Sequence, residues 1–252
     1  MEIIFFHSKS QRRNVGFLLF FPVLFLACYR EPVTIIEGVE VPLTPDILSH
    51  EKIDSVIDGF EKIKFFELDT AYISYSDPLD KFEKKLKKLE YSIVKGRDVF
   101  KKIVGPFRVM HFLSHDKYYS ANLNNVDANL EQYWLVDKKM LHMLLDLILE
   151  LERLGYDKYG FMVRCGHRNP RCNIASKGSG QSQHQFGRAA DLEIKDINKD
   201  GKSTDEDKQI VLEILEKIVD DDGGLGLYPG TMSVHLDSRG HRARWNSYKS
   251  PY

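Results

Sequence analysis

The sequence predicts an α+β fold built on a small antiparallel sheet with flanking helices, preceded by a mainly helical N-terminal region. Apolar residues at helical spacing over 138–154 and about 206–219 alternate with strand-like segments over 189–194 and 233–237. These segments follow one another without a regular βαβ rhythm, which favours α+β over a parallel α/β sheet. The 252 residues, 42% apolar and 29% charged, are typical of a globular protein with a sizeable core.

Each element of residues 106–252 has its own signal. The helix expected over Lys138–Leu154 is apolar almost all round, which is typical of a buried helix, and Gly155 follows as a natural cap. A second helix is expected from about Glu206 to Val219. Short strands are expected at Phe107–Leu113, Phe161–Val163, Ala189–Ile194 and Ser233–Asp237.

Residues 28–105 are expected to form a tether and a helical region of unknown role. The prolines of residues 29–50 and the lack of periodicity there indicate the tether. From about 51 to 104 the pattern is helical, with apolar residues at three- and four-residue steps, namely Phe82, Leu86, Leu89 and Ile93. Gly105-Pro106 is the expected boundary with the C-terminal domain of residues 106–252.

The first 27 residues have the pattern of a signal peptide. Basic residues are followed by an apolar run over 15–27, which is too short to span a bilayer as a helix and contains Pro22. The run ends at Cys28 in a segment that resembles the lipobox of bacterial lipoproteins, with Phe25 in place of the usual Leu. We therefore expect export to the bacterial cell envelope and a lipid anchor on Cys28. Cleavage nearby, with an incidental Cys28, is the alternative.

Charge and cysteine content restrict the function classes further. The 36 basic and 37 acidic residues give a net charge of −1, which argues against a nucleic-acid partner. Cys165 and Cys172 flank a short segment rich in turn formers, and in an oxidising compartment they would form a disulfide. A metal pair is the alternative, although Cys-x6-Cys matches no common zinc spacing.

Two strand-like segments carry potential metal ligands on one face. In Ala189–Ile194 the alternation places Asp191 and Glu193 opposite the apolar residues, and in Ser233–Asp237 it places His235 and Asp237 together. If the two strands lie together, His184, Asp191 and His235 surround one cation. Two imidazoles and a carboxylate leave a fourth position for water, as in catalytic zinc sites.

The segment Ser182-x-His184-x-x-Gly187-x-Ala189-x-Asp191 resembles the signature of zinc D,D-peptidases, which cleave D-Ala-D-Ala or related peptidoglycan peptides. This murein endopeptidase-like family shares its fold with the hedgehog signalling domain. The stretch 165–173 is similar to the Ser-Gly-Tyr-Arg-Ser-Pro…Asn segment of these enzymes, and 226–237 with Arg242 to Trp245 resembles their C-terminal motifs. The three motifs, in the right order, span roughly 138–245.

The resemblance implies catalytic Zn²⁺ on His184, Asp191 and His235, and peptide cleavage by a metal-activated water. Many relatives carry an acid three residues before the last histidine ligand, where this chain has Met232. We expect Asp237 to replace that acid as the general base, with Glu193 as an alternative, although either carboxylate could instead orient a ligand. The resemblance also implies that Arg168 polarises the scissile carbonyl or binds a substrate carboxylate; a loop salt bridge is the alternative.

A second cation site is expected directly after the zinc strand. The spacing of an EF-hand loop is matched at positions 1, 3 and 5, with Gly201 at position 6 and a carboxylate at position 12. The position-12 residue is Asp instead of Glu, and a strand precedes the loop. The sequence thus favours a structural Ca²⁺ site over a plain acidic turn, with ligands Asp196, Asn198, Asp200, Lys202 and Asp207.

The resemblance implies an exported zinc peptidase, of carboxypeptidase or endopeptidase type, that acts on peptidoglycan stem peptides. A non-catalytic module that retains the metal for stability and binds cell wall or protein is the alternative, favoured by Met232. Residues 30–105 could also form a docking domain for an envelope partner. The sequence does not predict the oligomeric state.

Overall fold

A computed structural model describes residues 44–78, 80–114 and 131–248. The expected signal peptide, Cys28 and most of the tether lie outside these residues. The described residues belong to one compact unit. Within them, no helix is long and apolar enough to cross a membrane.

The main sheet has five strands in the order β10-β8-β9-β7-β6. All neighbouring strands are antiparallel except β8 and β10, which run parallel. The strands are β6 (Phe161–Cys165), β7 (Ala189–Ile194), β8 (Gly224–Leu227), β9 (Ser233–Asp237) and β10 (Ala243–Asn246). This mixture of helices and a mainly antiparallel sheet is compatible with the α+β class expected from the sequence.

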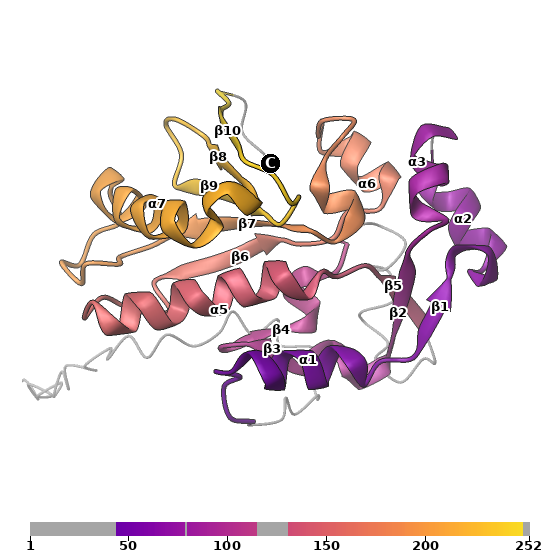
Figure 1. Cartoon of the computed structure of the whole chain (residues 1–252), viewed down its shortest axis with the longest axis horizontal. Coiled ribbons are helices and arrows are strands. Elements are labelled where there is room, and N and C mark those ends of the chain that lie inside the picture. The colour runs from indigo at the N-terminus through magenta and orange to yellow at the C-terminus, as the bar shows by residue number, and fades with distance from the viewer. Residues whose placement is uncertain (1–43, 79, 115–130, 249–252) are drawn as a thin grey trace, which may run out of the picture. The chain divides into compact units, whose positions relative to one another are not determined.

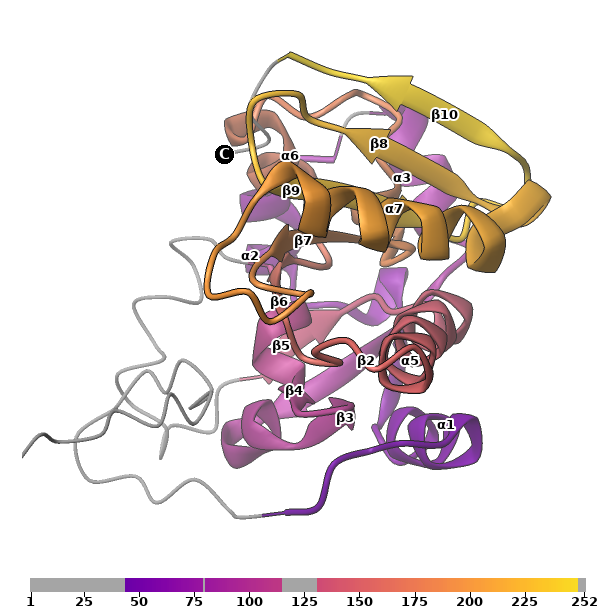
Figure 2. The ribbon, with the colours of Figure 1, turned by 90° about the vertical axis from the view of Figure 1, so that its left-hand side faces the viewer.

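Helices α5 (Lys138–Arg153) and α7 (Asp205–Val219) pack against the same face of this sheet (Figures 1 and 2). The apolar residues of β7 and β9, which alternation assigned to one face, lie in this core: Ala190, Leu192, Ile194, Val234 and Leu236. The opposite face carries Asp191, His235 and Asp237. The expected separation of apolar and acidic faces is therefore confirmed.

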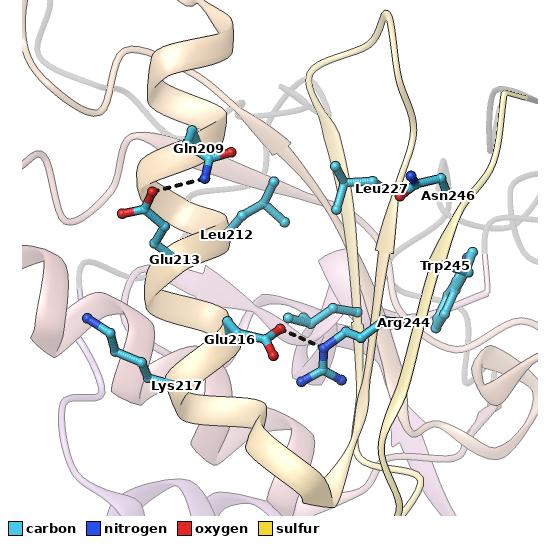
Figure 3. A pocket seen from close by; sticks show the side chains of 10 residues that line it. Gln209, Leu212, Glu213, Glu216, Lys217, Leu227, Arg244, Trp245 and Asn246 are labelled. Atoms are coloured by element: carbon cyan, nitrogen blue, oxygen red, sulfur yellow. Dashed lines mark hydrogen bonds and ion pairs between the residues drawn. The ribbon is translucent and has the colours of Figure 1, made fainter.

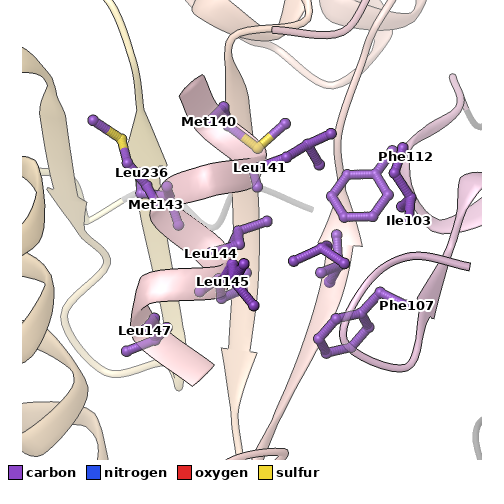
Figure 4. Packing of buried hydrophobic residues seen from close by; sticks show 14 of the residues in the cluster. Ile103, Phe107, Phe112, Met140, Leu141, Met143, Leu144, Leu145, Leu147 and Leu236 are labelled. Atoms are coloured by element: carbon purple, nitrogen blue, oxygen red, sulfur yellow. The ribbon is translucent and has the colours of Figure 1, made fainter. Parts of the chain in front are cut away.

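Helix α5 is buried on two sides, as its nearly continuous apolar sequence predicts. Leu236 of the main sheet lies on one side of the helix, and Ile103, Phe107 and Phe112 lie on the other (Figure 4). Its buried residues are Met140, Leu141, Met143, Leu144, Leu145, Leu147, Ile148 and Leu151. The helix ends at its cap residue Leu154, next to Gly155, whose φ is +82°.

The expectation of a mainly helical region over 51–104 is wrong in part. Helices α1 (His50–Asp58), α2 (Thr70–Ser76) and α3 (Asp80–Leu86) are present, with short 3-10 helices at Phe65–Glu67 and Gly96–Phe100. The region also contains strands β1 (Lys62–Lys64), β2 (Glu90–Lys95) and β3 (Lys102–Val104). Ile93, expected on a helix with Phe82 and Leu86, lies instead in β2.

Long-range pairing explains this difference. Strand β2 is hydrogen-bonded on one side to β1 and on the other to β5 (Glu131–Trp134), and four successive residues of β2 are buried. Because the buried residues of β2 are consecutive, they show no two-residue alternation of buried and exposed positions, so their spacing does not distinguish strand from helix. The three strands, α2 and α3 enclose a second apolar cluster that includes Phe82, Leu86 and Ile93.

The sequence around Gly105-Pro106 connects the two regions. Strand β3 pairs with β4 (Phe107–Arg108) across this turn, and β5 joins β2 from beyond it. The strand expected over Phe107–Leu113 is limited to β4, because a 3-10 helix occupies Val109–Phe112. Residues from both sides of position 105 thus share one core.

Candidate metal centre

The three expected zinc ligands are buried and meet on the face of the main sheet opposite α5 and α7. Asp191 and His235 are directly opposite each other in the β7–β9 ladder, and His184 lies in the 3-10 helix Gln183–Phe186 just before β7. His184 Nε2 lies 3.2 Å from both His235 Nδ1 and Asp191 Oδ1. His235 Nδ1 lies 2.8 Å from Asp191 Oδ1. One atom from each side chain therefore points to a common place.

These distances fit a tetrahedral zinc ion. Zinc bonds to nitrogen and oxygen are about 2.0–2.1 Å long, so two ligand atoms on one tetrahedron lie about 3.3 Å apart. The three separations, 2.8 to 3.2 Å, are close to that edge. Two imidazole nitrogens and one carboxylate oxygen are also a donor set that zinc prefers.

The outer hydrogen bonds of the two histidines orient their lone pairs. His184 Nδ1 lies 2.6 Å from the Gly166 carbonyl oxygen, and His235 Nε2 lies 3.1 Å from Asp237 Oδ2. Both oxygens only accept, so with a metal ion bound these outer ring nitrogens would carry the protons, and His184 Nε2 and His235 Nδ1 would present lone pairs to the ion. Without the ion, His235 Nδ1 can instead donate to Asp191 Oδ1, 2.8 Å away. With Asp191 Oδ1, three electron-rich atoms converge, which is the arrangement that binds a cation.

Burial and neighbouring charges shift the pKa values of the three groups. Burial lowers the pKa of His184. Burial opposes ionisation of Asp191, but the two histidines hold its pKa well below the ordinary value. Burial likewise opposes protonation of His235, but hydrogen bonds to Asp191 and Asp237 raise its pKa. The carboxylate therefore stays ionised at neutral pH, as a ligand must.

Arg168 holds the far side of Asp191. Its Nη2 lies 2.5 Å from Asp191 Oδ2, while its Nε donates to Cys165 Sγ at 2.9 Å. Arg168 is only 5% exposed, yet it lines the cleft beside the histidines. The salt bridge agrees with the alternative interpretation of this residue, and contact with substrate stays a prediction.

Sequence reasoning missed Cys165 as a neighbour of the metal ligands. Its sulfur lies within 4.8 Å of ligand atoms of both His184 and Asp191, so these three residues form a second potential ligand set. Burial raises the pKa of the Cys165 thiol to about 12, and Arg168 occupies the sulfur with a hydrogen bond. The shorter distances within the His184, Asp191 and His235 set make that set the better fit.

The expected Cys165–Cys172 disulfide is not formed. Cys165 ends β6 opposite Asp191, and Cys172 lies in helix α6 (Pro170–Ala175). The position of Cys165 beside Arg168 and the ligands, which its spacing to Cys172 does not reveal, accounts for the difference. The turn-rich segment between the two cysteines is instead ordered by α6, whose first turn is capped by the Asn169 side chain.

Asp237 lies next to the site but has no oxygen free of protein contacts. Its Oδ1 accepts from Arg239 Nε at 2.7 Å and from the backbone N–H groups of Gly224 and Arg239. Its Oδ2 accepts from Arg239 Nη2 at 2.6 Å and from His235 Nε2. Burial opposes ionisation, but Arg239 and His235 together lower the pKa of Asp237. These contacts favour the role of orienting His235, and the general-base assignment stays a prediction.

Arg239 is a site residue that sequence reasoning missed. It forms a fork with both oxygens of Asp237. The sequence could have indicated Arg239, because residues 235, 237 and 239 continue the alternation of β9 beyond the end of the strand. The alternative base, Glu193, lies farther along β7 and forms salt bridges with Arg164 and Lys195. Met232 packs at the edge of the apolar core.

The expected calcium loop is folded around its own backbone. Asp196 accepts from the N–H groups of Asp200 and Gly201, Asn198 accepts from Asp200, and Asp200 accepts from Lys202. Asp207 is fully buried, and its two oxygens accept from the backbone of Ile197, Asn198 and Thr204. Asp207 thus caps α7, and the Ca²⁺ site stays a prediction.

A cleft of about 510 Å³ lies over the candidate metal centre. Three cationic side chains line it, Arg168, Lys177 and Arg239, and none of its described lining residues is a carboxylate. Lys177 takes part in no salt bridge within the described residues, and it follows α6 with a φ of +53°. Because Arg168 and Arg239 are already paired with Asp191 and Asp237, Lys177 is the cationic side chain of this lining left to attract a ligand with negative charge.

A larger cavity, of about 590 Å³, lies between α7 and strands β8 and β10 (Figure 3). Its rim carries the Glu216–Arg244 salt bridge, with 2.6 Å between Glu216 Oε2 and Arg244 Nε. None of the described residues that line it belongs to the ligand set. The smaller cleft is consequently the one that can support metal chemistry.

Residues 135–237 match the model of a family described as Peptidase M15. The matched segment runs from just before α5 to Asp237 and contains all three ligands. M15 peptidases use zinc, so this match suggests a zinc peptidase, in agreement with the ligand geometry. The comparisons with curated proteins and with solved structures give no match.

Gly187, a residue of the His184–Asp191 motif, provides a test of this architecture. Its φ is +66°, and a Cβ there would lie 2.1 Å from the Leu135 carbonyl oxygen. Gly187→Ala should lower the free energy of unfolding by more than the ~1–2 kcal/mol of a left-handed residue alone. Gly230→Ala is the matched control, because Gly230 has a φ of +77° and open space around it. Equal losses of unfolding free energy in the two variants, measured by urea unfolding, would contradict the close contact of Gly187 with Leu135.

Proposed function

We propose that this protein is an exported zinc peptidase that cleaves peptidoglycan stem peptides. The observation that carries the proposal is the convergence of three lone pairs from His184, Asp191 and His235 within the segment that matches the M15 family. A zinc ion held there would supply a water of lowered pKa and an electrophile for a peptide carbonyl.

The remaining site residues would hold and orient the side chains of the ligands. Arg168 holds Asp191 in position, and Asp237 would keep the proton of His235 on Nε2. Arg239 neutralises the charge of Asp237. Ligand histidines that donate their second nitrogen to a carboxylate or carbonyl bind metal more tightly.

The cationic lining of the cleft supports a peptide substrate with carboxylate groups. Arg168, Lys177 and Arg239 surround the place where such a substrate would lie. Stem peptides of peptidoglycan carry free carboxylates close to their D-amino acid bonds. The signal-peptide pattern of residues 1–27 and the lipobox-like segment at Cys28 support a lipid-anchored enzyme in the bacterial cell envelope.

A non-catalytic, metal-stabilised binding module is the second candidate. Met232 stands where relatives have an acid, and both oxygens of Asp237 are occupied by Arg239 and His235. With these contacts, the described site shows no unengaged carboxylate next to the ligand set. A binding module would need the same metal geometry but no proton acceptor.

Digestion of purified muropeptides distinguishes the two candidates. The native protein should release a peptide or amino acid, lose this activity to a chelator and regain it with Zn²⁺. His184→Ala should abolish both zinc binding and cleavage. Zinc binding without any cleavage by the native protein would favour the binding module.

Asp237→Ala then separates the two roles of this carboxylate. If Asp237 orients His235, the substitution should weaken zinc binding about 10–100-fold and lower activity as well. If Asp237 is the general base, the substitution should lower kcat while the zinc content stays unchanged. Measuring zinc affinity and kcat on the same preparation therefore assigns the role.

Lys177→Gln tests the charge of the cleft. We expect KM to rise about two- to fivefold for peptides with a free C-terminal carboxylate, because an exposed ion pair contributes about 0.2–1 kcal/mol. The kcat should not change, and peptides with a C-terminal amide should show no effect. Lys52→Gln, at an exposed residue of α1, is the control variant. An equal change for acid and amide peptides would contradict the assignment.

We also propose that the loop of residues 196–207 binds Ca²⁺, a proposal supported by its spacing and by the clustered oxygens of Asp196, Asn198 and Asp200. Calcium at a hundredfold excess over its Kd should raise the Tm of the zinc-loaded protein by about 5–10 °C. Asp196→Ala should remove this shift, whereas Asp221→Ala, at an exposed residue elsewhere, should not. A native Tm that does not respond to calcium would argue against the site.

A further inference from the structure

The metal ligands are part of a row of residues that crosses the main sheet. The strand register places Cys165 opposite Asp191, Asp191 opposite His235, His235 opposite Gly226, and Gly226 opposite Trp245. Residues paired in this way project from the same face of a sheet. Each of the five strands thus contributes one residue to this row, on the face that carries the candidate metal centre.

Trp245 reaches the ligand His235 although a whole strand separates them. Neighbouring strands lie about 4.8 Å apart, so the backbones of β10 and β9 are about 10 Å apart. The ring centroids of Trp245 and His235 nevertheless lie 5.1 Å apart, with an interplanar angle of 57°. The indole must therefore extend over β8.

Gly226 makes this crossing sterically feasible. A Cβ at position 226 would lie 2.6 Å from Cε2, 2.6 Å from Cζ2 and 2.7 Å from Nε1 of the Trp245 indole. The φ of Gly226 is not in the left-handed region, so its backbone conformation does not require glycine. The need for glycine here is the space that the indole occupies.

Gly224 leaves space in the same way for Asp237 and Arg239, the side chains that hold His235. A Cβ there would lie 2.4 Å from Asp237 Oδ2 and 2.9 Å from Arg239 Nε. Leu225, by contrast, is buried in the core on the opposite face. The Gly-Leu-Gly-Leu sequence of β8 thus presents bare backbone to the metal site and leucine to the helices.

The Trp245 indole also contacts Arg239. The Arg239 guanidinium, which is fixed by both oxygens of Asp237, lies 5.0 Å from the centroid of the Trp245 ring. Trp245 lines the metal cleft and also the cavity beside α7 (Figure 3). His235 is therefore confined at its two nitrogens by Asp191 and Asp237 and on its ring by Trp245.

We propose that Trp245 is a positioning residue for the metal ligand His235, and that Gly226 is required so that the indole can reach it. The inference rests on the proposed function only in that His235 binds a metal ion. Trp245 restricts rotation of the imidazole, which keeps Nδ1 directed at His184 and Asp191. Loss of this contact weakens metal binding without removing a ligand.

The test measures zinc affinity in the full-length protein by competition with a fluorescent chelator. Gly226→Ala should weaken zinc binding about 10–100-fold, the usual effect of losing a partner that orients a ligand. Trp245→Ala should do the same, whereas Trp245→Phe, which retains a ring, should recover most of the affinity. Gly59→Ala is the matched control, since its Cβ would meet only backbone oxygens at 3.4 Å.

The outcomes separate this inference from the proposed function. A native protein that binds no zinc overturns the proposed function and the inference with it. Native zinc binding that is unchanged in Gly226→Ala or Trp245→Ala overturns the inference alone. If Gly226→Ala does not fold, the comparison of Trp245→Ala with Trp245→Phe decides, and equal affinities for these two variants refute the positioning role.

Discussion

The pairing of Asp191 with His235 across β7 and β9 is the contact on which the rest of the site depends. It sets the register of the two central strands, because a shift by one residue would turn both ligands into the apolar core. Arg168 contacts Asp191, and Asp237 contacts His235 and is itself held by Arg239. The two carboxylates of Asp191 and Asp237 are balanced by Arg168 and Arg239, which makes their burial tolerable on this face of the sheet.

Much of this arrangement could be predicted from local patterns. Strands β7 and β9 have the expected bounds because apolar and polar residues alternate in them without interruption. Helices α5 and α7 begin and end within one or two residues of the expected positions, since their caps are local signals. The same alternation placed Asp191 and His235 on one face, whereas His184 was expected there from the motif that precedes β7. Strand β2 was missed because its apolar residues, among them Ile93, also fit a helical period.

The surroundings of the ligands depend on contacts that no local pattern encodes. Cys165 lies beside Arg168 and opposite Asp191 only because β6 pairs with β7, so its spacing to Cys172 was misleading. Asp237 was expected to receive a proton, yet its oxygens are occupied by a side chain two residues away and by the backbone of β8. The order of strands in a sheet, here β10-β8-β9, decides which residues become neighbours.

The double-sided burial of α5 has a consequence for whether the family-matched segment can fold alone. Residues 135–237 contain the ligands, but one side of α5 is covered by Ile103, Phe107 and Phe112, which precede that segment. A fragment that starts near residue 135 would leave this apolar surface in water, where it favours aggregation. The described residues before 135 therefore belong to the same folding unit, which is larger than the segment that matches the family model.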